Sequence, residues 1–192
     1  MEDKDILNLI FEFGQLRRIK HEGWRLVGVE NPDSVAEHSL RAAQIGFLLA
    51  KMEKYENPYE VCTMVVFHDI GECRIGDIHK VALRYLEADE ERVVREQTEN
   101  LEDIGKDILK LWQEFEAKTT TAGIIAKDAD RLEQAVMAKE YIERGHASAK
   151  DWIINVSRLL KTKSAKKLLK LLETTDSTDW WEGLKKLIME DK

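Results

Sequence analysis

Two histidines and two aspartates have types and spacing that suit a shared divalent metal ion. His68 and Asp69 stand side by side after an apolar run, His38 precedes them, and Asp130 follows much later among small and apolar residues. Burying an imidazole beside a carboxylate costs several kcal/mol unless something compensates. Imidazole and carboxylate are both good ligands for a divalent metal, so a bound ion would supply that compensation.

Each of these residues also has an ordinary structural interpretation. His38 alone would be a histidine in the first turn of a helix. Asp130 alone would pair with Lys127 or Arg131 on a solvated helix face. Glu72, four residues after the second histidine, would be a surface carboxylate in the last turn of a helix. Taken together, the set favours a metal site.

Helical periodicity predicts the elements that would position these residues. Ser34 and Glu37 form a capping box at the start of the helix that carries His38. Asn57 before Pro58 predicts the start of the next helix, which runs to the His-Asp pair. The expected helices cover residues 5–19, 34–54, 58–69, 88–103, 107–118 and 119–144, with two or three shorter ones in 150–190.

Strict alternation of apolar and polar residues is almost absent, so the sequence predicts a single all-α domain over 1–192. Its core motifs fall in about 5–145. A loop is expected over 21–33. Two successive helices that fold back on each other would bring the start of one beside the end of the other, and with them His38 and the His-Asp pair. The predicted architecture is a helical bundle with the metal site between helices.

The order His, His-Asp, Asp resembles that of the HD-domain metal-dependent phosphohydrolases. The local strings are similar to the 5′-deoxynucleotidase branch of that superfamily, and the resemblance covers about residues 5–145. The tail from about 150 to 192 matches less specifically. The strings are Ser34–Ser39, His68–Glu72, Gly76–Ile78 and Lys127–Glu133.

The resemblance implies that His38, His68, Asp69 and Asp130 are the metal ligands. Two imidazoles and two carboxylates favour Mn²⁺, Co²⁺ or Fe²⁺, while Zn²⁺, Ni²⁺ and Mg²⁺ are possible. Such an ion would polarise a phosphate oxygen and lower the pKa of a bound water toward neutrality.

The same resemblance implies roles for the carboxylates after the His-Asp pair. Glu72 would act as acid or base on the water or the leaving oxygen. Asp77 would accept a hydrogen bond from the sugar 3′-hydroxyl. Alternatively, Glu72, Asp77 and the carbonyl of Ile78 would form a second, weaker metal site, since two-metal clamps are common in phosphate-ester hydrolysis.

A phosphate needs cationic partners besides a metal, and basic residues flank the loop before His38. Trp24 lies in that loop, where it could stack on the substrate or cap the core. Members of the resembled branch carry an arginine just before this tryptophan or three residues before it. Here those positions are Gly23 and His21, so the phosphate contact is expected to pass to Arg18 or His21.

The resemblance therefore implies a phosphomonoesterase that converts deoxyribonucleoside 5′-monophosphates to deoxynucleosides and phosphate. One alternative is a related phosphohydrolase acting on a cyclic nucleotide, a triphosphate or a guanosine polyphosphate. Those substrates would need additional basic residues, and the site region has few. The other alternative is a non-catalytic, metal-stabilised helical scaffold, but every ligand position is filled.

The composition of the chain limits which binding partners and which cellular location we expect. The net charge of −7 does not favour nucleic acid. No apolar run approaches the ~18 residues that span a bilayer, and the acidic N-terminus is unlike a signal peptide, so we expect a cytoplasmic protein with no membrane partner. Amphipathic helices beyond those needed for one core favour a homodimer, as does the resemblance. The charged region 88–118 and the tryptophan-bearing tail are the expected interface candidates.

Overall fold

The computed structural model describes residues 2–184, and helices dominate that part of the chain. No strand occurs within the described residues, which contain an isolated antiparallel bridge between Lys20 and Ser34. The prediction of an all-α fold is confirmed. The α-helices are α1 (Asp3–Phe13), α2 (Val35–Met52), α3 (Pro58–Val66), α4 (Glu72–Ile75), α5 (Glu90–Thr98), α6 (Glu102–Ala117), α7 (Thr121–Glu143), α8 (Lys150–Leu159) and α9 (Lys163–Leu172).

The helix starts follow the sequence signals closely. Ser34 caps α2, its hydroxyl accepting the N–H of Glu37, whose carboxylate accepts the N–H of Ser34 in return. Asn57 caps α3 and Pro58 is its first residue, where a missing N–H costs nothing. Both predictions are confirmed.

Some predicted boundaries are wrong, and the differences lie near the candidate site. The helix expected over 5–19 ends at Phe13 and continues as a 3₁₀ turn, η1 (Gly14–Arg17). The expected loop 21–33 contains a second 3₁₀ helix, η2 (Glu22–Val27). The helix α3 ends at Val66 instead of running through the His-Asp pair, because Phe67 leaves helical geometry and tight turns follow.

The later boundaries also shift. The helix predicted over 88–103 is α5 followed by the 3₁₀ turn η4 (Glu99–Leu101), and α6 begins at Glu102, earlier than the predicted 107. After α9 the described chain holds one further short 3₁₀ helix, η6 (Asp179–Trp181). The rest of the predicted C-terminal helical region, and with it the single domain over 1–192, extends beyond the described residues and stays a prediction.

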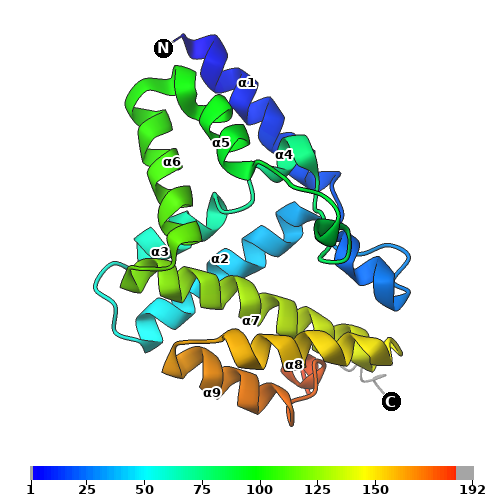
Figure 1. Ribbon diagram of the computed structural model, residues 1–192. Coiled ribbons are helices and arrows are strands. Elements are labelled where there is room, and N and C mark those ends of the chain that lie inside the picture. The colour runs from blue at the N-terminus through cyan, green and yellow to red at the C-terminus, as the bar shows by residue number, and fades with distance from the viewer. Residues whose placement is uncertain (1, 185–192) are drawn as a thin grey trace, which may run out of the picture.

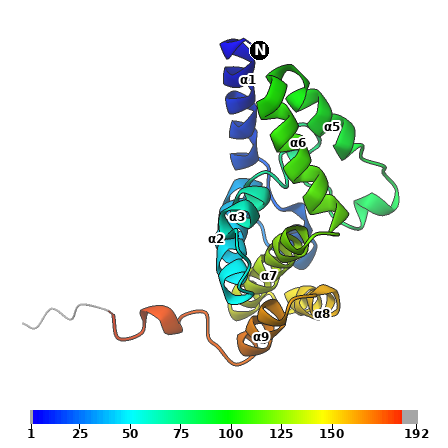
Figure 2. The ribbon, with the colours of Figure 1, turned by 90° about the vertical axis from the view of Figure 1, so that its left-hand side faces the viewer.

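The central core lies where α2 and α3 pack against α7 (Figure 1). Leu49, Met64 and Ile125 are among its fully buried side chains, one from each of these helices. The helices α8 and α9 cover the other side of α7, and α1 packs with α5 and α6 around a separate cluster, as Figure 2 also shows. None of the helices described combines the length and the apolar character needed to cross a bilayer. The long helix α7 is therefore the element against which the others are placed.

Candidate metal centre

The structure brings the four predicted ligand residues together between α2, α7 and the α3–α4 turn. His38 lies in the first turn of α2, His68 and Asp69 lie in the turn after α3, and Asp130 lies in the middle of α7. His38 Nε2 is 3.4 Å from Asp130 Oδ1 and 3.8 Å from Asp69 Oδ2, and His68 Nε2 is 2.8 Å from Asp69 Oδ2. Both histidines and Asp130 are buried. The packing of α2 on α3 and α7 creates this proximity.

The environment of His68 fits a bound cation. Its Nδ1–H donates to the carbonyl oxygen of Val65 at 2.7 Å, because a carbonyl can only accept. The lone pair of Nε2 therefore faces the carboxylate of Asp69. Nε2 is buried and, within the described chain, makes no hydrogen bond, since its short contact with Asp69 is not aligned for one. Two electron-rich atoms held this close need a positive charge between them, and the N₂O₂ donor set suits a divalent metal.

Charge interactions outweigh burial at the cluster. Burial alone would lower the pKa of His38, but the carboxylates of Glu133 and Asp130 raise it well above its ordinary value. Burial alone would raise the pKa of Asp130, but Lys127 and His38 hold it well below the usual range. The pKa of Asp69 is likewise lowered, since the neighbouring histidines overcome its burial. Both aspartates therefore stay ionised, as ligands must be.

Glu72 opens α4 on the border of this cluster. Burial, together with the charges of Asp69 and Asp77, raises the pKa of Glu72 to about 10. Its Oε2 is buried without a hydrogen bond in the described part of the chain. A carboxylic acid in this state carries a proton at neutral pH and can donate it.

Asp77 and Ile78 follow a turn at Gly76, whose φ of 75° and ψ of 168° favour glycine. One oxygen of Asp77, Oδ2, accepts the backbone N–H of Glu22 at 2.7 Å. Burial and the charges of Asp69 and Glu22 raise the pKa of Asp77. Its other oxygen remains for a further partner, and Ile78 lies half-buried beside it.

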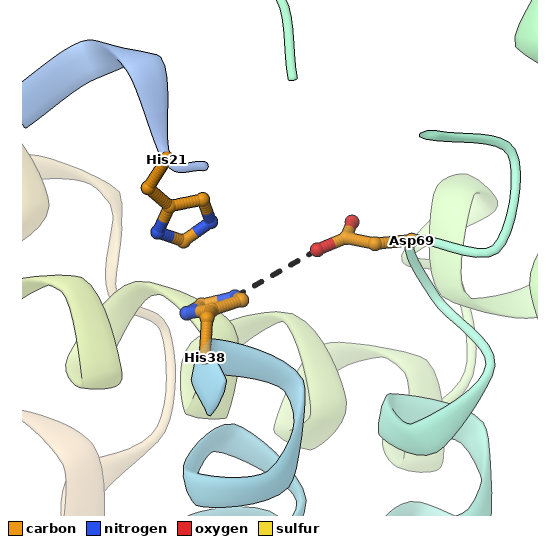
Figure 3. Close-up of side chains that lie close together, drawn as sticks. All are labelled: His21, His38 and Asp69. Carbon is orange, nitrogen blue, oxygen red and sulfur yellow. Dashed lines mark ion pairs between the residues drawn. The ribbon is translucent and has the colours of Figure 1, made fainter. Parts of the chain in front are cut away.

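His21 also faces the cluster (Figure 3). Its ring centroid is 4.4 Å from that of His38, and its Nδ1 is 3.3 Å from Asp33 Oδ2. Two groups of three residues each bring one ligand atom per residue to within 4.8 Å of the others. The first group is His21, His38 and Asp69, and the second is His38, His68 and Asp130. The sequence marked His21 only as a phosphate contact, because nothing local shows that η2 folds over His38.

Two residues of α7 join the site without having been assigned a role from the sequence. Lys127 Nζ is 3.2 Å from Asp130 Oδ2 and lies 4.2 Å from the centroid of the Phe115 ring. The pairing of Asp130 with Lys127 was expected on a solvated face, whereas Asp130 is buried. Glu133, one turn after Asp130, contacts His38 and is equally buried. The spacing from Asp130 to Glu133 on one inward face was the available signal.

The structure does not bring Trp24 to the cluster. Its ring is 2% exposed and packs against Tyr141 and Trp152, so it caps the core and offers no open face to a nucleobase. The stacking prediction for Trp24 is wrong, because η2 turns the ring inward. Arg18 is exposed at the end of η1, and its phosphate contact stays a prediction.

The comparison with family models now bears on this geometry. Residues 13–173 match the HD domain model. The chain belongs to the HD domain family. This membership confirms the family resemblance seen in the motifs, and the four residues of the cluster fall inside the matched range.

Named relatives and solved structures agree with that membership. The chain is 34% identical to 5′-deoxynucleotidase HDDC2 of Dictyostelium discoideum over 143 residues, which is 69% of this chain and 75% of the relative. It is 27% identical to the human protein of that name over 147 residues, 74% of this chain and 71% of the relative. A conserved hypothetical protein from Pyrococcus furiosus superposes with a TM-score of 0.70 at 29% identity, covering 88% of this chain and 99% of that one.

Proposed function

We propose that this HD domain protein is a metal-dependent phosphomonoesterase that hydrolyses deoxyribonucleoside 5′-monophosphates to deoxynucleosides and phosphate. The observation that carries the proposal is the buried His68 Nε2, directed at the carboxylate of Asp69 with no hydrogen bond in the described chain. The substrate class is supported by the name 5′-deoxynucleotidase that the relatives share.

The proposed ligands are His38, His68, Asp69 and Asp130. With two nitrogen and two oxygen ligands, Mn²⁺, Co²⁺ and Fe²⁺ are favoured, while Zn²⁺, Ni²⁺ and Mg²⁺ are less suited. A bound ion of this kind would polarise a phosphate oxygen and activate water as a nucleophile. The cluster keeps both aspartates ionised and both Nε2 atoms turned inward, which is the arrangement that such an ion requires.

Glu72 is the proposed catalytic residue. Burial and the charges of Asp69 and Asp77 raise its pKa in the metal-free protein. With a metal in place, Glu72 would act as acid or base on the water or the leaving oxygen. Asp77 is proposed to accept the sugar 3′-hydroxyl, because Glu22 occupies only one of its oxygens. The alternative remains that Glu72, Asp77 and the Ile78 carbonyl hold a second metal.

For the substrate phosphate we favour His21 over Arg18. His21 lies against His38 and is oriented by Asp33, so its free nitrogen faces the cluster (Figure 3). Arg18 is exposed and would have to turn inward. A His21→Ala variant should raise KM for the nucleotide more than Arg18→Ala does.

The test begins with purified protein stripped of metal. Single ions are added back, and phosphate release is measured from a panel of 5′- and 3′-nucleotides with deoxyribose or ribose. Metal-dependent release from deoxynucleoside 5′-monophosphates is expected, and His68→Ala should abolish both metal binding and release. Release only from cyclic nucleotides, triphosphates or guanosine polyphosphates would replace the substrate. Tight metal binding with no release from any of them would favour the scaffold.

We also propose that the protein is a homodimer in the cytoplasm without a nucleic-acid partner. An apolar groove of about 340 Å³ lies between η1, α2 and the end of α3, with Leu40 62% exposed on it. Phe11 and Trp180 are exposed as well, and the segment after α9 projects away from the bundle (Figure 2). A second copy of the chain could cover these side chains, which supports the tail as a candidate interface.

A further inference from the structure

An ion network, buried at Glu133 and half-buried at Arg41 and Glu140, lies on the side of His38 that faces away from the aspartates. Glu133 Oε2 lies 2.5 Å from His38 Nδ1 and accepts its N–H. Arg41, on the same face of α2, donates to Glu133 Oε1 from Nε at 2.8 Å and from a terminal nitrogen at 2.6 Å. The same guanidinium donates to Glu140 at 2.8 Å. The Glu133 carboxylate is therefore held by three hydrogen bonds.

These contacts determine which nitrogen of His38 keeps its proton when the other nitrogen binds a metal. A neutral imidazole has one N–H, and an ionised carboxylate can only accept. In the neutral ring, with the N–H on Nδ1 directed at Glu133, the lone pair lies on Nε2 and faces Asp69 and Asp130. Arg41 holds the other carboxylate oxygen, Oε1, with two charge-assisted hydrogen bonds, so Oε2 stays directed at His38.

We propose that Glu133, fixed by Arg41, is a positioning residue that holds His38 in the tautomer and orientation needed to bind the metal. The inference rests on the proposed function in taking the cluster as a metal site. Glu133 acts through His38 and contacts neither the ion nor the substrate. Partners of this kind on histidine ligands typically change metal affinity by about 10- to 100-fold.

The variant Glu133→Gln tests the proposal because an amide cannot serve both neighbours. If its oxygen accepts from Arg41, its NH₂ faces His38 Nδ1 and selects the tautomer with the proton on Nε2. If the amide is reversed, its NH₂ meets the donors of Arg41. The affinity of the metal-free protein for Co²⁺, measured by titration calorimetry, should therefore fall about 10- to 100-fold.

Asp128→Asn is the matched control. Asp128 is a fully buried carboxylate on the same helix, but it accepts from the backbone N–H groups of Lys161 and Thr162, away from His38. This variant should unfold more easily and still bind Co²⁺ within about twofold of wild type, since Asp128 shares no hydrogen-bond partner with His38 or Glu133.

Arg41→Lys is a second variant. It keeps the positive charge beside Glu133 but loses the paired hydrogen bonds that the guanidinium donates. Its affinity should fall between wild type and Glu133→Gln, and it carries the test if Glu133→Gln does not fold. A folded Glu133→Gln that binds Co²⁺ as tightly as wild type overturns the proposal, as does an unchanged Arg41→Lys if Glu133→Gln is unfolded. If wild type binds no Co²⁺, the metal site of the proposed function fails instead.

Discussion

Metal binding at this cluster should release protons, because two of its groups hold a proton that a cation would displace. The carboxylates around His38 raise its pKa well above the ordinary value, so its Nε2 is protonated in the metal-free protein at neutral pH. The pKa of Glu72 is about 10, so it too is protonated. His38, Asp69 and Asp130 would hold the ion, and in the metal-free protein His38 Nε2 faces the two carboxylates.

The number of protons released depends on the interactions that hold each proton. Ligation requires the lone pair of His38 Nε2, so one proton must leave. The proton on Glu72 is held by burial and by the charges of Asp69 and Asp77, and a divalent cation beside Asp69 offsets those charges. We therefore expect about two protons released per ion near pH 7. Since protons are products of binding, affinity rises with pH, by up to about 100-fold per pH unit while both groups remain protonated in the free protein.

Calorimetric titration with Mn²⁺ or Co²⁺ in two buffers of different ionisation heat measures this release directly. Glu72→Gln serves as the control, since it should release about one proton fewer while keeping the four ligands. A metal affinity that stays constant between about pH 6 and pH 8, with no buffer dependence of the heat, would refute the reasoning.

Three further variants test other parts of the structure. Asp128→Asn should lower the free energy of unfolding by about 1–3 kcal/mol in urea titrations, because the amide keeps one oxygen acceptor for the backbone N–H groups of Lys161 and Thr162 and loses the second, charged one; an unchanged free energy of unfolding would contradict this account. Leu40→Glu should convert the proposed homodimer to a monomer by light scattering, and an unaltered dimer would place the interface elsewhere. Gly76→Ala should cost about 1–3 kcal/mol, since its φ of 75° strains any other residue, and should raise KM by displacing the carboxylate that follows it.

Much of the fold could be predicted because the chain marks its helix starts locally. The capping box at Ser34 and the Asn57-Pro58 pair use contacts within a few residues, and both are found as expected. The end of α3 could not be predicted in this way. The apolar run continues through Phe67, and only packing decides that the backbone turns there and buries His68.

The candidate site also combines features that a local motif indicates with features that depend on distant contacts. The proximity of the four proposed ligands could be predicted, because their order and spacing form a motif. For Glu133 the helical spacing from Asp130 indicated an inward position but not a role, because its partners His38 and Arg41 lie 95 and 92 residues away in sequence. Trp24 was ambiguous for a related reason, since the side of η2 that faces the core depends on contacts with Tyr141 and other distant residues.

The two histidines of the cluster are fixed by different kinds of contact, and this difference has a consequence for stability. His68 donates Nδ1–H to Val65, three residues earlier, so its orientation forms together with the turn. His38 depends on Glu133, which is in place only when α2 packs on α7. A metal ion that needs both Nε2 atoms would therefore bind only the packed state, and by mass action it would stabilise the contact between these two helices. An ion bound at this cluster would therefore also hold together the helices that carry its proposed ligands.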